Sequence, residues 1–387
     1  MMADRPVVVL GGGIVGTAIA YELQGAGATT ILVERDIEPQ GASAFSFASI
    51  SSFDEPQQDV YLLKSHGMIQ WRRWAQIFGD QLGARFPGEI RWAGSSESAR
   101  YLNELLERAT GRGYPIRTIS AEQIKVLEPA VRLNGTEAAT LAPDDGYADP
   151  LRAIDALRAA FSEGGGTILL GRASLIIEES GITVRVGEDR IEASSVVVAT
   201  GAETTALLER LGWEIPMDPS PGLLCITEPV ERFLNRTIYV YPRDEVPVHL
   251  RQLDDGRVLI GERAQDEVAK DPTGEHAHML LRQARKVFPA LEATEVDHFT
   301  VEWRPMPRDK KPIVGPLPGL STLYVATGHS GVTIAPALAR FIAEEFVKGA
   351  EQELLRPFRP GRFSAHDADA YKSVEEAFGG GSEVFIG

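Results

Sequence analysis

The chain has one cysteine, Cys225, among its 387 residues. A single cysteine excludes an intrachain disulfide and a cysteine-rich metal site. Cys225 lies in the apolar run GLLCIT, which favours a small buried side chain over a nucleophile. His276 and His278 are two residues apart in an expected helix, so they cannot share one of its faces. The sequence therefore predicts no metal site.

Positive charge is also scarce, because 39 lysines and arginines face 55 acidic residues and leave a formal charge of −16. That balance argues against a nucleic acid or an anionic membrane surface as the main partner. No apolar run approaches the roughly 18–20 residues that span a bilayer. The N-terminus also lacks a basic region followed by a long apolar stretch. We therefore expect a cytoplasmic globular protein with no transmembrane segment and no signal peptide.

The N-terminal segment carries a phosphate-binding pattern. VVVLGGGIVG predicts a buried strand, a G-x-G-x-x-G turn at Gly11, Gly13 and Gly16, and a helix that stops at Gly25. A second strand over residues 29–33 ends at Glu34. The glycines let a pyrophosphate approach the positive end of the helix, and Glu34 can accept hydrogen bonds from a ribose. This order predicts a dinucleotide site, and a βαβ unit without a ligand is the alternative.

Local signals organise the rest of the chain. An irregular loop is expected over residues 38–53, followed by a helix over 59–78. Ser120 and Asp149 are predicted to cap the two helices that follow them. A strand ending in Thr200 and Gly201 is expected to return to the nucleotide sheet, and Asp255-Gly256 predicts a hairpin turn. The segment from Phe363 is predicted to be a loosely held tail or an oligomer contact.

Five segments now stand in a recognisable order: GGGIVG with VERD, GAS, VVVATGA, WRPMPRDKKPIVG and ATGHSGVTIAP. On these segments the chain resembles the D-amino acid oxidase superfamily of FAD-dependent enzymes, which includes glycine oxidase, sarcosine oxidase and D-amino acid dehydrogenase. The resemblance implies an α/β fold, with a Rossmann-like FAD-binding domain and an interleaved β-rich (α+β) substrate domain. It assigns 1–85, 144–215 and 303–362 to the FAD-binding domain, 86–143 and 216–302 to the substrate-binding domain, and 363–387 to a C-terminal tail.

The resemblance also implies the contacts of a non-covalent FAD. The glycine turn would take the pyrophosphate, residues 47–49 would pass near the flavin ring, and residues 328–333 would present amides to its pyrimidine edge. Backbone amides at a helix start have independent sense there, since they stabilise negative charge on a reduced flavin. The implied cofactor residues are Gly11, Gly13, Ile14, Val15, Gly16, Glu34, Arg35, Ala42, Ser43, Phe47, Ala48, Ser49, Ala173, Thr200, Gly201, Gly328, His329, Ser330, Gly331, Val332 and Thr333.

The substrate side has fewer candidates. By the resemblance, Arg304 matches the family's carboxylate clamp, and a guanidinium supplies two parallel donors. A salt bridge from Arg304 to Asp309 is the alternative. The glycine that commonly follows this aspartate in the family is here Lys310, which puts the local turn in question.

The wall of the pocket is expected from a strand of the β-rich domain. His249 and Arg251 share one side of that strand, with Tyr241 and Tyr239 as weaker catalytic candidates. His249 would position the amine or tune its protonation, and a partly buried structural histidine is the alternative.

The implied reaction is oxidation of the C–N bond of a small amino acid or secondary amine. Hydride passes to flavin N5, and the resulting imine hydrolyses. The electron acceptor stays open between dioxygen, a quinone and a partner subunit, and oligomerisation is possible. Lys310 or Lys311 would be either a cation used with dioxygen or surface charge. The alternatives are a 2-hydroxy acid dehydrogenase, the flavin subunit of a hetero-oligomeric amine dehydrogenase and, as an outlier, an enzyme that uses only NAD.

Overall fold

A computed structural model describes residues 5–133, 135–178, 181–242, 246–262, 273–363 and 383–385. Its first body is built on a six-stranded sheet with the order β18-β19-β12-β1-β2-β8. All neighbours in this sheet are parallel except β18 and β19. The strands are β1 (Val7–Leu10), β2 (Thr30–Glu34), β8 (Thr167–Leu170), β12 (Ser195–Val198), β18 (Ile313–Leu317) and β19 (Leu320–Thr327). The expected return of residues 195–198 to the nucleotide sheet is confirmed by the pairing of β12 with β1.

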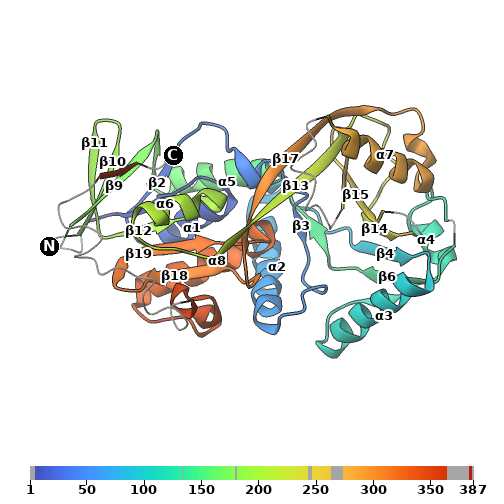
Figure 1. The fold of residues 1–387 in the computed structure, drawn as a ribbon, viewed down its shortest axis with the longest axis horizontal. Helices are drawn as coiled ribbons and strands as arrows, with labels where there is room; N and C mark the ends of the chain where they lie inside the picture. Colours follow the sequence, from blue (N-terminus) through green and yellow to red (C-terminus); the bar gives the residue numbers. More distant parts are fainter. Residues whose placement is uncertain are drawn as a thin grey trace.

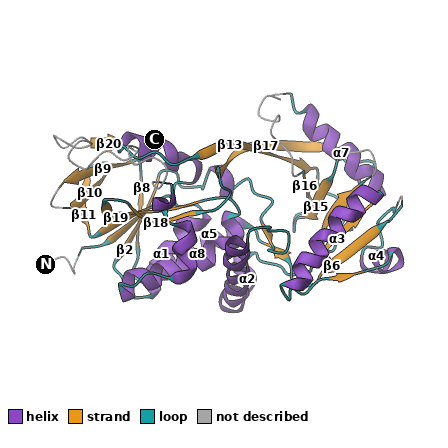
Figure 2. Cartoon of the chain, turned by 60° about the horizontal axis from the view of Figure 1, so that its bottom comes forward, coloured by secondary structure: helices purple, strands orange, loops and turns teal. Residues whose placement is uncertain are grey.

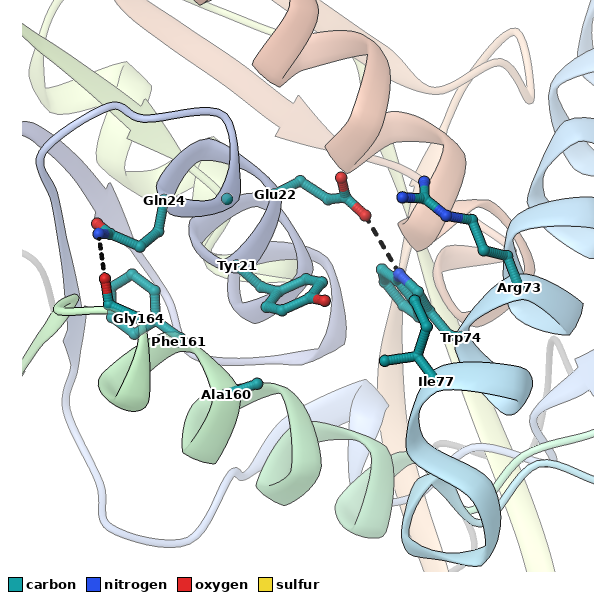
Figure 3. A pocket seen from close by; sticks show the side chains of 10 residues that line it. Tyr21, Glu22, Gln24, Arg73, Trp74, Ile77, Ala160, Phe161 and Gly164 are labelled. Carbon is teal, nitrogen blue, oxygen red and sulfur yellow. Dashed lines mark hydrogen bonds between the residues drawn. The ribbon is translucent and has the colours of Figure 1, made fainter.

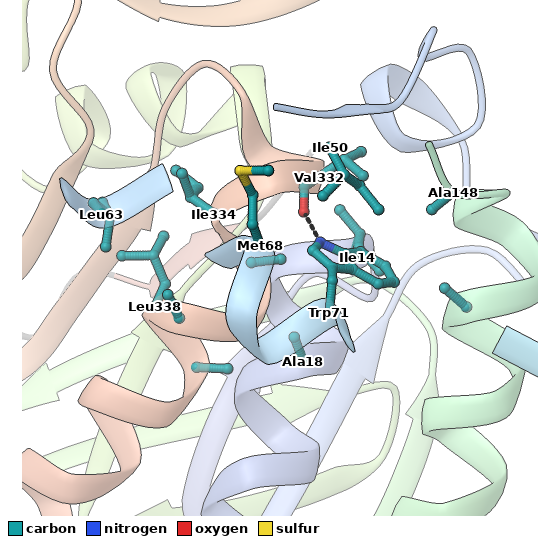
Figure 4. Close-up of a cluster of buried hydrophobic side chains, with 14 of the residues drawn as sticks. Ile14, Ala18, Ile50, Leu63, Met68, Trp71, Ala148, Val332, Ile334 and Leu338 are labelled. Carbon is teal, nitrogen blue, oxygen red and sulfur yellow. Dashed lines mark hydrogen bonds between the residues drawn. The ribbon is translucent and has the colours of Figure 1, made fainter. Parts of the chain in front are cut away.

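Helices cover this sheet because its strands are apolar on both faces. On one face lie α1 (Ile14–Gly25), α5 (Pro150–Glu163) and α8 (Gly331–Lys348), which Figure 2 shows side by side. Outside them, α2 (Gln58–Phe78) packs on α8 through Trp71, whose indole N–H donates to the carbonyl of Val332 at 2.8 Å (Figure 4). The other face is covered by α6 (Thr204–Arg210) and a small sheet. That sheet has the order β11-β10-β9-β20.

The second body is an eight-stranded sheet with the order β17-β13-β16-β15-β14-β4-β6-β5. The long strands β13 (Met217–Thr227) and β17 (Val296–Pro307) run from one body to the other (Figure 1). The other strands are β4 (Glu89–Ala93), β5 (Arg117–Thr118), β6 (Ala138–Ala142), β14 (Thr237–Tyr241), β15 (Val248–Gln252) and β16 (Val258–Gly261). The accompanying helices are α3 (Ser96–Gly111), α4 (Ala121–Leu127) and α7 (Glu275–Val287).

Alternation along these strands separates the two faces of the second sheet. Ile238, Leu250 and Ile260 are buried in one apolar cluster with side chains of α7. Their neighbours Tyr239, His249 and Arg251 therefore point to the opposite face, toward the first body. The polar residues that the sequence singled out are thus brought to the boundary between the two bodies.

Several local expectations are confirmed. The Ser120 and Asp149 side chains cap α4 and α5, and β15 and β16 form the hairpin predicted at Asp255-Gly256. The loop at 38–53 was expected to lack regular structure, but it contains a 3₁₀ turn (Gly41–Ser43) and β3 (Ser49–Ile50). β3 forms because it pairs with a distant segment, β7 (Gly146–Tyr147), which no local signal predicts.

The C-terminal expectation needs a partial correction. Residues 383–385, placed in a loosely held tail, form β20 (Glu383–Phe385) and pair with β9 (Ala173–Glu178) of the same chain. β9 in turn pairs with β10 (Gly181–Val186), which pairs with β11 (Asp189–Ala193). The other residues of the predicted tail beyond 363 lie outside the described part of the chain.

One close approach between helices generates a stability prediction. A Cβ at Gly67 on α2 would lie 2.0 Å from the carbonyl oxygen of Thr333 on α8. Gly67→Ala should therefore push the helices apart and lower the free energy of unfolding by about 2 kcal/mol or more. Gly25→Ala is the matched control, because a Cβ there meets nothing within 4 Å. Chemical denaturation of both variants tests this, and equal stabilities would contradict it.

Candidate active site

The glycine turn after β1 leaves no room for side chains. Gly11 has φ +100°, and a Cβ there would lie 2.6 Å from the carbonyl oxygen of Ala199. A Cβ at Gly16 would lie 1.8 Å from the carbonyl oxygen of Gly11. Ser43 closes the turn from outside, because its Oγ accepts the Ile14 N–H at 3.1 Å. The sequence-predicted residues 11–16 and Ser43 are therefore together at the start of α1.

Glu34 ends β2 beside this turn. Its carboxylate accepts the backbone N–H of Gly12 and, at 2.7 Å, that of Arg35. The Arg35 side chain pairs with Asp36 at 2.9 Å and Glu203 at 3.0 Å, and these partners raise its pKa. A dinucleotide needs backbone N–H donors at a helix start for its pyrophosphate and a carboxylate acceptor at the end of the second strand for its ribose. These residues fit FAD.

Arg158 on α5 also contacts the glycine turn after β1, and no sequence pattern predicted this contact. Its Nη2 donates to the Gly12 carbonyl at 2.9 Å and its Nη1 to the Ile37 carbonyl at 3.1 Å. Burial lowers the pKa of this guanidinium, while the nearby Glu34 raises it. No local signal distinguishes Arg158 from a surface arginine, because its partners are distant in sequence.

Two further turns meet at the end of the sheet. The Thr327 hydroxyl donates to the Gly201 carbonyl at 3.0 Å, which joins the turn after β12 to the turn after β19. In the latter, Ser330 has φ +59° and its hydroxyl lies 3.1 Å from His329 Nδ1. His329 itself is exposed. The remaining predicted residues in these regions are Ala42 beside Ser43, Ala173 at the start of β9, Thr200 before Gly201, and Gly328 and Gly331 to Thr333 around the start of α8.

The loop at 47–49 touches the polar face of the second sheet. The ring centroids of Phe47 and His249 are 4.3 Å apart, and the Ser49 hydroxyl lies 3.2 Å from the Tyr239 hydroxyl. Tyr239 stacks on His249 with ring centroids 4.9 Å apart. Gly261, opposite His249, leaves the space that this imidazole fills, because a Cβ there would lie 2.5 Å from Nε2. The structure therefore brings the predicted loop and the predicted substrate strand into contact.

Arg91 on β4 extends this stack and was missed by sequence reasoning. The central carbon of its guanidinium lies 4.2 Å from the centroid of the Tyr239 ring. The guanidinium also pairs with Glu89 at 2.6 Å and with Asp54 at 3.3 Å. The same guanidinium donates to the Tyr241 hydroxyl at 3.3 Å. Arg91 is recognisable only from the register in which β4 pairs with β14.

Arg304 lies on β17 opposite Ser220. Its Nη2 donates to the Ser220 hydroxyl at 2.7 Å and its Nε to the Ser220 carbonyl at 3.3 Å. Asp309, the salt-bridge alternative for Arg304, pairs with Arg362 at 2.8 Å. Asp309 also accepts the Lys311 N–H at 3.0 Å on its carboxylate and the Gln57 side-chain amide at 3.0 Å on its carbonyl.

The two lysines after Asp309 differ in their surroundings. The ammonium of Lys311 pairs with Asp59 at the start of α2. Lys310 is exposed, has φ +62°, and donates its N–H to the Pro307 carbonyl at 2.7 Å. The turn is therefore retained in the left-handed conformation that favours glycine, although a lysine occupies it.

Other features lie away from this region. Cys225 is buried in the apolar cluster of the second sheet, and burial raises its pKa to about 12. A cavity of about 270 Å³ lies between α1, α2 and α5, where Tyr21, Trp74 and Phe161 are among its lining side chains (Figure 3). Among the described residues, no group of three or more His, Cys, Asp or Glu side chains could hold a metal ion.

Comparison with known proteins identifies the family. The family model described as DAO, FAD dependent oxidoreductase, matches residues 6–345. The chain belongs to the FAD-dependent oxidoreductase family. FAD is accordingly its cofactor, and the α/β fold with a Rossmann-like FAD-binding domain expected from the sequence is confirmed. The protein is an oxidoreductase.

The names of several relatives of this FAD-dependent oxidoreductase describe oxidation of amino acids or amines. The chain is 26% identical to glycine oxidase of Pseudomonas aeruginosa, over 89% of this chain and 94% of the relative. It is 25% identical to 4-methylaminobutanoate oxidase (formaldehyde-forming) of Paenarthrobacter nicotinovorans, over 93% of this chain but 46% of that protein. The crystal structure of L-proline dehydrogenase from P. horikoshii has the same fold, with a TM-score of 0.83, 24% identity, and coverage of 94% and 98% of the two chains.

The length and apolar character of the helices bear on membrane insertion. Within the described ranges, none of them combines the length and the apolar character that crossing a bilayer would need.

The strained turn generates a stability prediction. Lys310→Gly should raise the free energy of unfolding by roughly 0.5–1 kcal/mol, because glycine adopts positive φ without steric cost. Lys310→Ala removes the charge and keeps the strain, so it should bring no such gain. Thermal and denaturant unfolding of both variants distinguish the two causes. Equal stabilisation by glycine and alanine would assign the effect to charge instead.

Proposed function

We propose that this FAD-dependent oxidoreductase oxidises the C–N bond of a small amino acid or secondary amine at the boundary between its two bodies. The contact that carries the proposal is the Phe47 ring against the His249 imidazole at 4.3 Å. It joins the loop expected beside the flavin to the strand expected beside the substrate. FAD, when bound, supplies the hydride acceptor, so no protein nucleophile is needed.

In this proposal Arg304 binds the substrate carboxylate. A guanidinium offers two parallel N–H donors to the two oxygens of a carboxylate, which fixes the orientation of a small amino acid. The hydrogen bonds from Arg304 to Ser220 support the assignment, because they hold the side chain from one edge. Both carboxylate oxygens of Asp309 accept hydrogen bonds from Arg362.

His249 is assigned to the amine. A substrate ammonium with a pKa near the ~10.4 of lysine must lose its proton, at a cost of about 4–5 kcal/mol at pH 7. The imidazole of His249 accepts that proton, and the Tyr239 ring stacked on it keeps its plane fixed. The guanidinium of Arg304 favours the neutral amine by repelling its cationic form. Tyr241, whose hydroxyl accepts a hydrogen bond from Arg91, is assigned to the wall of the substrate pocket.

We propose that the cofactor is held by the turns at the end of the first sheet and by the 47–49 segment. Residues 11–16, Glu34 and Ser43 would hold the pyrophosphate and ribose, and residues 47–49 and 328–333 would flank the ring. FAD is proposed to be non-covalent, a view supported by the full burial of Cys225. The separate sheets support the proposed division into an FAD-binding domain and a substrate-binding domain.

The test is anaerobic mixing of the FAD-loaded protein with D-amino acids, glycine, N-methyl amino acids and 2-hydroxy acids. Loss of the oxidised flavin absorbance with one amine class is expected. Loss with 2-hydroxy acids alone would replace the proposal with hydroxy acid oxidation. No loss with any compound would contradict direct amine oxidation and favour a partner subunit. Admitting dioxygen or a quinone to the reduced protein then identifies the acceptor.

The carboxylate clamp makes a kinetic prediction. Arg304→Met should raise KM for the amine substrate roughly 10- to 100-fold, because a charge-assisted hydrogen bond contributes about 1.5–3 kcal/mol. Steady-state kinetics measure this. Arg308→Met is the matched control, since Arg308 lies nearby, is exposed, and pairs with Asp218 at 3.5 Å. An unchanged KM in Arg304→Met, or an equal rise in both variants, would remove Arg304 from the substrate site.

A further inference from the structure

Consecutive carbonyl groups of residues 47–49 are each held by a different part of the chain. The Phe47 carbonyl accepts Arg251 Nε–H from β15 at 2.8 Å. The Ala48 carbonyl accepts the Ala148 N–H at 3.0 Å, and the Ser49 carbonyl accepts the Thr333 hydroxyl at 2.7 Å. Each of the three carbonyl groups in this short segment therefore accepts a hydrogen bond from a residue outside the segment.

The segment needs such support because its middle residue is strained. Ala48 has φ +57°, in the left-handed region that residues with a Cβ rarely adopt. Strained conformations of this kind persist only where the surrounding contacts over-determine them, and they gather at functional sites. Ala48 is buried, so water does not provide those contacts.

Arg251 differs from the other two supports because it comes from the second sheet and carries a charge. It is only 3% exposed, and its guanidinium lies 4.8 Å from the Tyr147 ring. Burial lowers its pKa to about 10, so it stays cationic at neutral pH. The acids that favour its charge are engaged elsewhere, since Asp149 caps α5 and Asp254 pairs with Arg152 at 3.2 Å.

We propose that Arg251 is a positioning residue that holds the 47–49 segment in its strained form and places a buried positive charge behind it. The proposal rests on the placement of the flavin ring beside this segment in the proposed function. It replaces the substrate-side role expected for Arg251 from the sequence. A cation buried near the ring lowers the energy of the reduced cofactor, which carries more negative charge than the oxidised one.

The charge is tested by the reduction potential of the FAD-loaded protein. Arg251→Met should shift the equilibrium toward the oxidised form at least tenfold, which is about 30 mV for a two-electron couple. Arg251→Lys keeps the charge, so its reduction potential should stay closer to that of the wild type than the potential of Arg251→Met does. Arg152→Met, which removes a neighbouring half-exposed cation, should change the equilibrium less than twofold. If Arg251→Met does not fold, Arg251→Gln removes the charge and keeps a donor for the Phe47 carbonyl.

The positioning role is tested by combining Arg251→Met with Ala48→Gly and measuring unfolding of the FAD-loaded protein. Glycine removes the strain at position 48, so the loss of Arg251 should cost less in that background. Additive effects together with unchanged potentials would overturn the proposal. Failure of every amine to bleach the wild-type flavin would instead refute the proposed function, because the potential and the unfolding cycle require no substrate.

Discussion

Direct contact between backbones, with no side chain between them, decides where the candidate site lies. Gly16 packs on the carbonyl of Gly11, so the first turn of α1 lies against the short turn that follows β1. Gly67 packs on the carbonyl of Thr333, so α2 draws against the first turn of α8. Thr333 in turn holds Ser49. The positions of the phosphate turn, of α8 and of the 47–49 segment are therefore mechanically linked.

The charges of the site contrast with those of the whole chain. The protein has a formal charge of −16, yet Arg91 and Arg251 lie buried at the boundary between its bodies. Arg91 is neutralised by Glu89 and Asp54. Arg158 is half-buried at the glycine turn of the first body, where it binds backbone carbonyls beside Glu34. Arg251 binds a backbone carbonyl and an aromatic face.

Local physics explains how much could be predicted from the sequence. The glycine turn, the Ser120 and Asp149 caps and the hairpin at Asp255-Gly256 depend on neighbouring residues, and the structure contains them all. The fold class followed from the order of motifs. By contrast, β3 and β20 form only by pairing with distant strands, and both were missed. Lys310 shows the converse, because the fold imposes positive φ on a residue that locally disfavours it.

The site residues follow the same division. Glu34 and Ser43 stand at positions that a short motif defines, and both contact the start of α1 or the turn before it. Arg91, Arg158 and the carbonyl contact of Arg251 depend on sheet register and on helix packing, which single-sequence patterns do not encode. A polar residue on a strand can be assigned to a face from alternation, but its partner across the boundary cannot.

The central claim is that the cofactor and a carboxylate-bearing amine meet where the 47–49 segment touches β15. A crystal structure of the FAD complex with a small non-oxidisable carboxylate tests it most directly. The claim predicts the flavin ring beside residues 47–49 and the carboxylate on Arg304, with two N–O distances of roughly 2.7–2.9 Å. A carboxylate bound elsewhere, or a ring turned away from His249, would contradict it.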